Sequence, residues 1–118
     1  MNLIRTLVAG VVAGFLTAGM GAATPAGAGE IHVAIDNFTF SPQQITVKAG
    51  DTVIWTNRDD IPHTATSTTK SFGSAALDTG ESFSFTFATP GSFSYFCALH
   101  PHMTGTIVVE AAAGDAAR

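Results

Sequence analysis

The chain is poor in cysteine and in basic residues. Of its 118 residues, one is cysteine and five are lysine or arginine, against nine aspartate or glutamate. A single cysteine excludes a disulfide within the chain. In an exported protein it would be a reactive thiol, one end of an intermolecular bridge or a metal ligand. The formal charge of −4 and the lack of basic clusters argue against nucleic acid as a partner.

The sequence also lacks internal repeats and any segment with convincing helical periodicity. From residue 30 onward, hydrophobic residues alternate with polar ones, which predicts strands. The alternating sets are Ile31, Val33 and Ile35; Ile45 and Val47; Val53 and Trp55; Phe83, Phe85 and Phe87; and Phe93, Tyr95 and Cys97. A last strand is expected over 106–110, whereas the Ser- and Thr-rich run 64–75 is expected to be irregular or at a sheet edge. Short strands separated by turn residues predict an all-β sandwich or barrel.

The first 28 residues have the features of a secretory signal peptide. A basic residue near the start precedes an apolar run over 7–20, and a small-residue sequence over 26–28 marks the expected cleavage point. A membrane anchor is the less favoured alternative, because the strongly apolar run is shorter than the roughly 20 residues that a span needs. We expect a mature domain over 29–110, exported to a bacterial periplasm, and a disordered tail over 111–118.

The residues with the most distinctive chemistry lie between Cys97 and Met103. This segment combines a thiol, the imidazoles of His100 and His102, and a thioether. Soft sulfur ligands together with imidazole suit copper. Spacings of three and six residues from Cys97 to His100 and Met103 require a tightly curled loop, which Pro101 stiffens by restricting its own backbone. Taken alone, Cys97 would equally well be a buried structural thiol.

A blue-copper site needs two imidazoles, one thiolate and a long axial methionine bond. His63, which follows Ile61-Pro62 in a predicted loop, is the candidate for the second imidazole, and His32 in a predicted strand is its rival. His102 is expected to point away from the metal, as an exposed imidazole at the mouth of the site. A role in partner docking or in a pH-dependent surface charge is the alternative. Zinc is less favoured, because an axial methionine gives no reason to expect it.

Three segments of the sequence resemble the cupredoxin family: 53–57 (VIWTN), 61–63 (IPH) and 95–103 (YFCALHPHM). The run 40–51 also resembles the opening strands of that family, so that the resemblance covers about residues 30–110. Within the family, the chain is most similar to amicyanins and plastocyanin-like proteins. The C-x-x-H-x-x-M spacing is that of the short ligand loop of amicyanins.

The resemblance implies a Greek-key β-sandwich that holds one type 1 copper ion cycling between Cu(I) and Cu(II). By motif position, His63, Cys97 and His100 would be the equatorial ligands and Met103 the axial ligand. Three positions depart from the family pattern. Thr64 stands where members usually have Asn or Ser, Phe93 stands where many have Tyr, and His102 stands where amicyanins are usually apolar.

The expected function is therefore electron transfer between a redox protein donor and acceptor, which bind transiently. No enzyme is expected, since the sequence shows no Ser/His/Asp arrangement, no second set of copper ligands and no open coordination position. The chain is expected to be a monomer without a stable membrane anchor. Two alternatives remain: a periplasmic protein that delivers or buffers copper with the same site, and a metal-free β-sandwich interaction domain.

Overall fold

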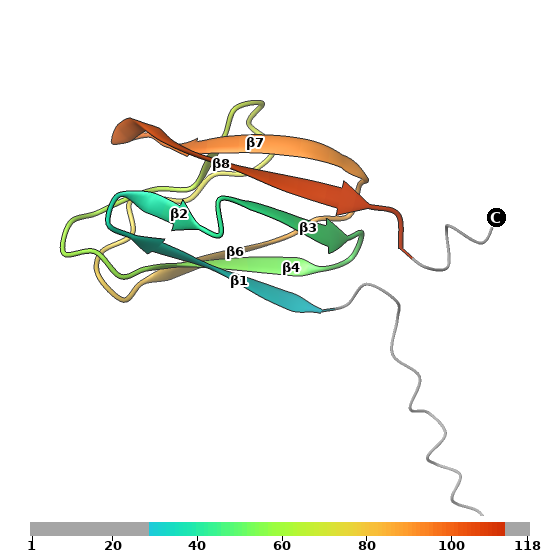
Figure 1. The fold of residues 1–118 in the computed structure, drawn as a ribbon, viewed down its shortest axis with the longest axis horizontal. Helices are drawn as coiled ribbons and strands as arrows, with labels where there is room; N and C mark the ends of the chain where they lie inside the picture. Colours follow the sequence, from blue (N-terminus) through green and yellow to red (C-terminus); the bar gives the residue numbers. More distant parts are fainter. Residues whose placement is uncertain (1–28, 113–118) are drawn as a thin grey trace, which may run out of the picture.

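The computed structural model describes residues 29–112, which form two four-stranded sheets packed face to face (Figure 1). The first sheet, in the order β2-β1-β4-β6, contains β1 (Glu30–Asp36), β2 (Thr39–Ser41), β4 (Thr52–Asn57) and β6 (Ser82–Thr86). The second, in the order β3-β8-β7-β5, contains β3 (Gln44–Lys48), β5 (Thr66–Ser67), β7 (Gly91–Cys97) and β8 (His100–Glu110). The all-β prediction is confirmed.

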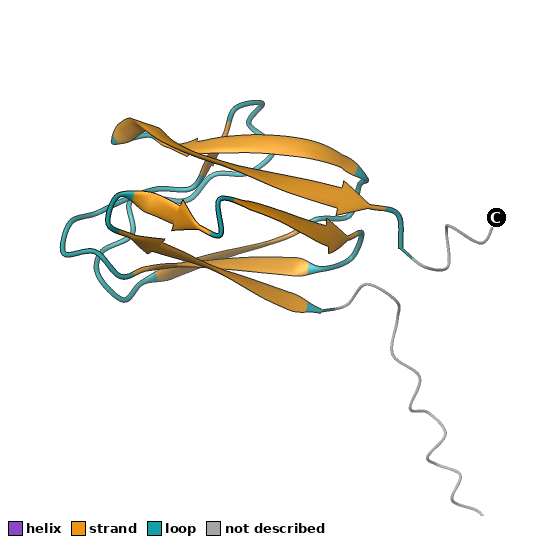
Figure 2. Cartoon of the chain, in the orientation of Figure 1, coloured by secondary structure: helices purple, strands orange, loops and turns teal. Residues whose placement is uncertain are grey.

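Residues 29–112 contain strands, turns and loops without a helix (Figure 2). This part of the chain accordingly offers no helix that is long and apolar enough to cross a membrane. The predicted signal peptide, residues 1–28, and residues 113–118 of the predicted tail lie outside the described residues.

Two sheets bring distant loops to one end of the sandwich. β1 pairs with β4 in parallel, from Glu30 opposite Thr52 to Ile35 opposite Asn57, so both strands finish at the same edge. β7, in the other sheet, also finishes at this end, where the chain turns into β8 (Figure 1). The loops that follow β1, β4 and β7 therefore meet there, although they are far apart in the sequence.

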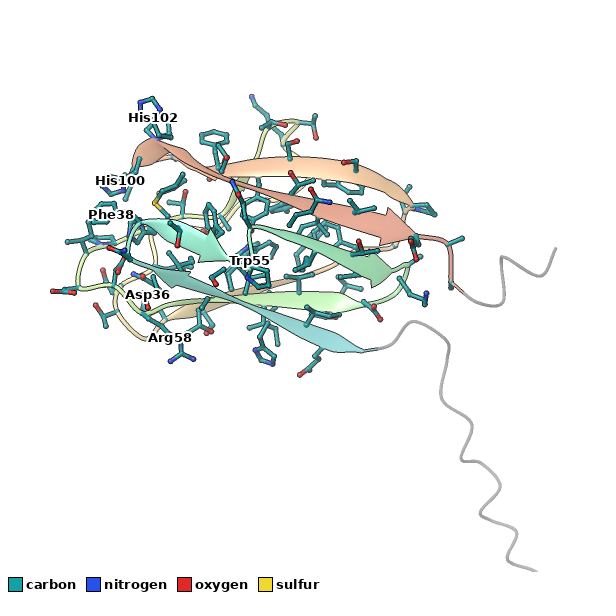
Figure 3. All side chains as sticks on the ribbon, in the orientation of Figure 1. Asp36, Phe38, Trp55, Arg58, His100 and His102 are labelled. Atoms are coloured by element: carbon teal, nitrogen blue, oxygen red, sulfur yellow. The ribbon has the colours of Figure 1, made fainter. Side chains whose placement is uncertain are left out.

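Aromatic side chains fill the space between the sheets. Trp55 is fully buried and stacks on Phe72 and Phe83, at ring-centroid distances of 5.4 and 5.6 Å. Its ring, which lies between the two sheets (Figure 3), also meets Tyr95 of the opposite sheet edge-on, at 5.5 Å. Because alternate residues of a strand point to the same face, the periodicity of the sequence predicted the inward positions of Trp55, Phe83 and Tyr95, whereas Phe72 comes from the run expected to be irregular. Aromatic contacts of this kind supply much of the packing energy of a small domain.

Tyr95 is the polar exception in this core. Burial raises the pKa of its phenol to about 12, and the nearby indole of Trp55 opposes this shift without cancelling it. Within the described residues, neither the phenol oxygen nor the indole nitrogen has a hydrogen-bond partner of normal geometry. The ring lies across from Gly105 of β8, its neighbour in the strand register. This close packing makes Gly105 important for stability.

β8 begins earlier than the sequence predicted. It starts at His100 instead of Thr106, and Cys97 pairs directly with His100, which leaves only Ala98 and Leu99 in the turn. Periodicity missed this part of the strand because the ligand segment does not alternate between hydrophobic and polar residues. Backbone pairing with β7 nevertheless continues through it, with a shift of register after Phe96. The Ser- and Thr-rich run was predicted correctly, since it contributes only the short edge strand β5.

Candidate metal centre

The turn between β7 and β8 holds two of the predicted ligands. Cys97 is the last residue of β7 and is fully buried, while His100 is the first residue of β8 and is half-buried. The Nδ1 atom of His100 lies 3.7 Å from the Cys97 sulfur. A two-residue turn between paired strands therefore holds these two side chains next to each other.

His63 joins them from the loop between β4 and β5. Its side chain is fully buried, and its Nδ1 atom lies 3.6 Å from the Cys97 sulfur. Its backbone exchanges two hydrogen bonds with Leu77, at 3.2 and 2.8 Å, which fix the loop in place. One donor atom from each of His63, Cys97 and His100 lies within 4.8 Å of the others. The rival His32 is exposed on β1 and takes no part in this cluster.

Asn57, at the end of β4, shapes the loop that carries His63. Its buried side-chain amide donates to the carbonyl oxygens of Ile61 and Leu77, both at 2.8 Å. Its side-chain oxygen accepts the N–H of Asp59 at 2.9 Å. These three bonds satisfy a buried amide and fix the path of the chain on the way to His63. In the sequence, Asn57 stands out only as the last residue of the family-like segment 53–57.

Asp59 orients the His63 ring, a role that the sequence analysis missed. Its Oδ2 atom lies 2.8 Å from His63 Nε2, and its two oxygens accept the N–H groups of Asn37 and Phe38 at 2.7 and 2.9 Å. Burial alone would raise the pKa of Asp59. The hydrogen bonds from Phe38 and Asn37, with the bond and charge of His63, outweigh burial and hold the pKa below its usual value. The ionised carboxylate favours the proton on Nε2, which leaves Nδ1 free to face the sulfur.

The three donors fit a copper ion. A thiol and two imidazoles converge from two loops, and the contact of His63 Nε2 with Asp59 leaves His63 Nδ1 facing the shared point. Two imidazoles with one thiolate form the equatorial set of blue-copper sites. Burial of Cys97 and His63 keeps water away from these donors, as a site for a soft, thiolate-bound ion requires. The geometry of the described residues is thus suited to one copper ion.

Residues 7–109 match the cupredoxin-like domain family. The chain is a cupredoxin. It is 37% identical over 87 residues to amicyanin of Paracoccus denitrificans, a match that covers 70% of this chain and 66% of that protein, just under two thirds. It is 32% identical over 113 residues to chloroplastic plastocyanin of Tetradesmus obliquus, covering 83% of this chain and 78% of that one. A solved amicyanin variant with Cu(I) superimposes with a TM-score of 0.65 at 30% identity, covering 69% and 82% of the two chains.

In this cupredoxin, Thr64 connects the two ligand loops. Its N–H donates to the Cys97 sulfur at 3.3 Å. Its hydroxyl oxygen accepts the N–H of Ala98 at 2.7 Å and shares a hydrogen bond with the Thr66 hydroxyl at 2.8 Å. The Thr64 side chain therefore provides a link between the two loops.

Replacing Thr64 by valine should destabilise the metal-free protein by about 1–3 kcal/mol, because the partly buried N–H of Ala98 would lose its acceptor. Valine keeps the shape of threonine, so the loss reflects the hydroxyl. Thr64→Ser retains the acceptor and removes only a buried methyl group, so it should lose no more than about 1 kcal/mol. Urea unfolding of the three metal-free proteins measures both effects. Equal stability of the valine and serine variants would argue against the link.

Met103 and His102, the remaining candidates, lie on opposite sides of the β8 backbone. Met103 is 5% exposed and faces the interior near the metal end, as an axial ligand would have to. His102 is exposed and points outward at the tip of the hairpin, away from the rest of the molecule (Figure 3). His102 lies outside the cluster of His63, Cys97 and His100, which agrees with the expectation that it turns away from the metal. The assignment of Met103 as a ligand stays a prediction.

Proposed function

We propose that this cupredoxin is an exported, mononuclear blue-copper electron carrier. His63, Cys97 and His100 serve as equatorial ligands and Met103 as the axial ligand. The observation that carries the proposal is the convergence of one buried thiol and two imidazoles from two loops that hydrogen bonds already tie together. The similarity to amicyanin and plastocyanin supports a carrier rather than an enzyme.

The chain's own residues hold the ligands in one geometry throughout the transfer. Bound copper would supply a one-electron couple between Cu(I) and Cu(II). Asp59 keeps the His63 ring oriented, and the N–H of Thr64 offsets negative charge on the Cys97 sulfur. The strand pairing of Cys97 with His100 limits movement of the turn. Because the ligands are fixed by the fold, little rearrangement accompanies a change of charge at the site.

His100 is the proposed port for electrons. Cys97 and His63 are fully buried, whereas His100 is half-buried and borders the exposed side chains Phe38 and Leu99. The apolar surface around this partly exposed ligand suits brief contacts with a redox protein donor and acceptor, since transient redox encounters need only a small contact area. We place the protein in the periplasm as a monomer, with residues 1–28 acting as the signal peptide.

The proposal is tested by adding Cu(II) to the purified exported protein and recording visible and electron paramagnetic resonance spectra. We expect an intense blue thiolate-to-copper band, narrow copper hyperfine splitting and repeated redox cycling with copper retained. His32→Ala, which removes the rival imidazole, should keep both signals, whereas His63→Ala should lose them. A pale protein with ordinary copper splitting would contradict a type 1 site.

Copper delivery with the same ligands is the second candidate function, since partial exposure of His100 would also give an acceptor access to the metal. It differs from electron transfer in one measurable respect. A delivery protein should pass Cu(I) readily to a competing Cu(I) chelator, while an electron carrier should keep the ion through many cycles. Rapid loss of Cu(I) at low chelator concentration would favour delivery.

A further inference from the structure

The turn between β1 and β2 places an exposed aromatic ring against both histidines of the metal centre. The ring of Phe38 meets His63 and His100 edge-on, with centroid distances of 5.2 and 5.0 Å and an interplanar angle of 84° in each case. The two imidazole rings are themselves 4.9 Å apart. Figure 3 shows Phe38 directly beside His100, on the side of the turn. Phe38 is therefore in contact with both imidazoles at once.

The backbone of this turn is unusual for the residues that it contains. Asn37 and Phe38 have φ angles of 52° and 58°, in the left-handed region that a bulky side chain such as Phe rarely occupies. The carboxylate of Asp59 accepts the N–H groups of both residues, and the same carboxylate contacts the His63 ring. One side chain thus holds both the strained turn and one of the imidazoles.

Hydrophobic burial accounts for only part of this arrangement. Phe38 is 48% exposed, so nearly half of its surface remains in water and contributes no hydrophobic stabilisation. The Asp59 hydrogen bonds and the contacts with the two imidazoles are therefore needed, beside this partial burial, to offset the strain of the turn. Strain that surrounding contacts maintain is often found where a side chain must be held in a particular place for function.

The two histidines differ in how their rings are held. Asp59 fixes the outer nitrogen of His63. Among the described residues, His100 has no hydrogen bond from its ring except the contact of its Nδ1 with the Cys97 sulfur. Its ring orientation therefore depends on packing, and Phe38 supplies an edge-on aromatic contact with it.

We propose that Phe38 is a positioning residue for His100. The turn that Asp59 holds places the Phe38 ring against the His100 imidazole and keeps this imidazole directed at Cys97. The proposal rests on the proposed function, since it concerns the same ligand set. It adds a residue outside the ligand segment and assigns Asp59 a second task, which is to hold the turn that carries Phe38. A simple docking role for Phe38 is the competing explanation.

Leu99 provides a matched control that separates these two roles. It is 50% exposed, nearly the same as Phe38, and it borders the same surface hollow beside His100. It has no aromatic ring to pack on the imidazole. Loss of docking surface should therefore be similar in Phe38→Ala and Leu99→Ala, whereas loss of ring positioning should appear only in Phe38→Ala. Both residues are exposed, so both variants should fold.

The first experiment follows the imidazole ring signals of the metal-free protein by nuclear magnetic resonance. In Phe38→Ala, the His100 signals should broaden because the imidazole exchanges between orientations once Phe38 is lost, and Leu99→Ala should leave their line widths close to wild type. Phe38→Tyr should restore the wild-type line widths. Unchanged His100 line widths in Phe38→Ala would overturn the proposal. This readout does not depend on copper, so it decides the proposal even if the protein proves not to be a blue-copper carrier.

The second experiment measures release of Cu(II) from the loaded protein to an excess of chelator. Phe38→Ala should release copper about 10- to 100-fold faster, the range typical of outer contacts that orient metal ligands. Phe38→Tyr and Leu99→Ala should release it at the wild-type rate. Equal release from Phe38→Ala and the wild type would contradict a positioning role. Failure of every variant and of the wild type to bind copper would instead refute the proposed function.

Discussion

Replacing Cys97 by serine is expected to abolish the intense visible band of the copper-loaded protein and its narrow hyperfine splitting. Both signals arise from a thiolate bound to copper, and a serine hydroxyl is neither soft nor readily ionised. Copper affinity should fall by more than the roughly 100-fold loss that outer contacts of a metal site can cause. Among single substitutions at the metal centre, Cys97→Ser should therefore have the largest effect.

His102→Ala is the matched control for Cys97→Ser. His102 lies in the same hairpin and can bind metals in general, but it is exposed and points away from the centre (Figure 3). Its loss should leave the band, the splitting and the copper affinity close to wild type. Circular dichroism of each metal-free variant checks that the sandwich is intact. A blue band in Cys97→Ser, or its loss in His102→Ala, would show that the ligands were assigned wrongly.

Gly105→Ala should destabilise the metal-free protein by about 2–3 kcal/mol, which is within the usual range for overpacking a core. A Cβ atom at this position would come within 3.0 Å of the Tyr95 ring and hydroxyl. Tyr95 has no room to move, because Phe40 and Trp55 contact it edge-on, at centroid distances of 4.6 and 5.5 Å. Urea unfolding followed by circular dichroism measures the loss.

Gly73→Ala controls for the general effect of adding a methyl group to glycine. A Cβ atom at Gly73 would meet nothing within 4 Å. Its stability should therefore stay within about 0.5 kcal/mol of the wild type. A double-mutant cycle with Tyr95→Leu identifies the clash, since the combined loss should be smaller than the sum of the two single losses. Additive losses, or a stable Gly105→Ala, would contradict the steric account.

Much of the fold was predictable because strand geometry is local. Alternation of hydrophobic residues placed Val33, Trp55 and Tyr95 on inward faces, and each is buried in the core. The same reasoning failed for the start of β8, where His100 to Thr106 does not alternate but still pairs with β7. Periodicity reports which face of a strand is buried, but not how far backbone hydrogen bonding continues beyond that pattern.

The ligand cluster was also largely predictable, because two of its donors lie within one short segment. Cys97 and His100 are three residues apart, and a turn that small brings their side chains together. The choice of His63 over His32 came from chemistry and from family resemblance. The structure places His63 in the cluster and supplies the physical reason: loops after strands that end at the same edge converge there.

Only the tertiary structure distinguished Asp59 from its neighbour Asp60 and revealed the contacts of Thr64 and Phe38. Asp59 binds backbone groups 21 and 22 residues away, and Thr64 binds an N–H 34 residues away. A sequence pattern has no information about such distances, because they depend on how the loops pass one another once both sheets have packed. The sequence alone therefore determined the sandwich and the chemistry of the donors. Packing of the sheets decided which polar and aromatic side chains hold those donors in place.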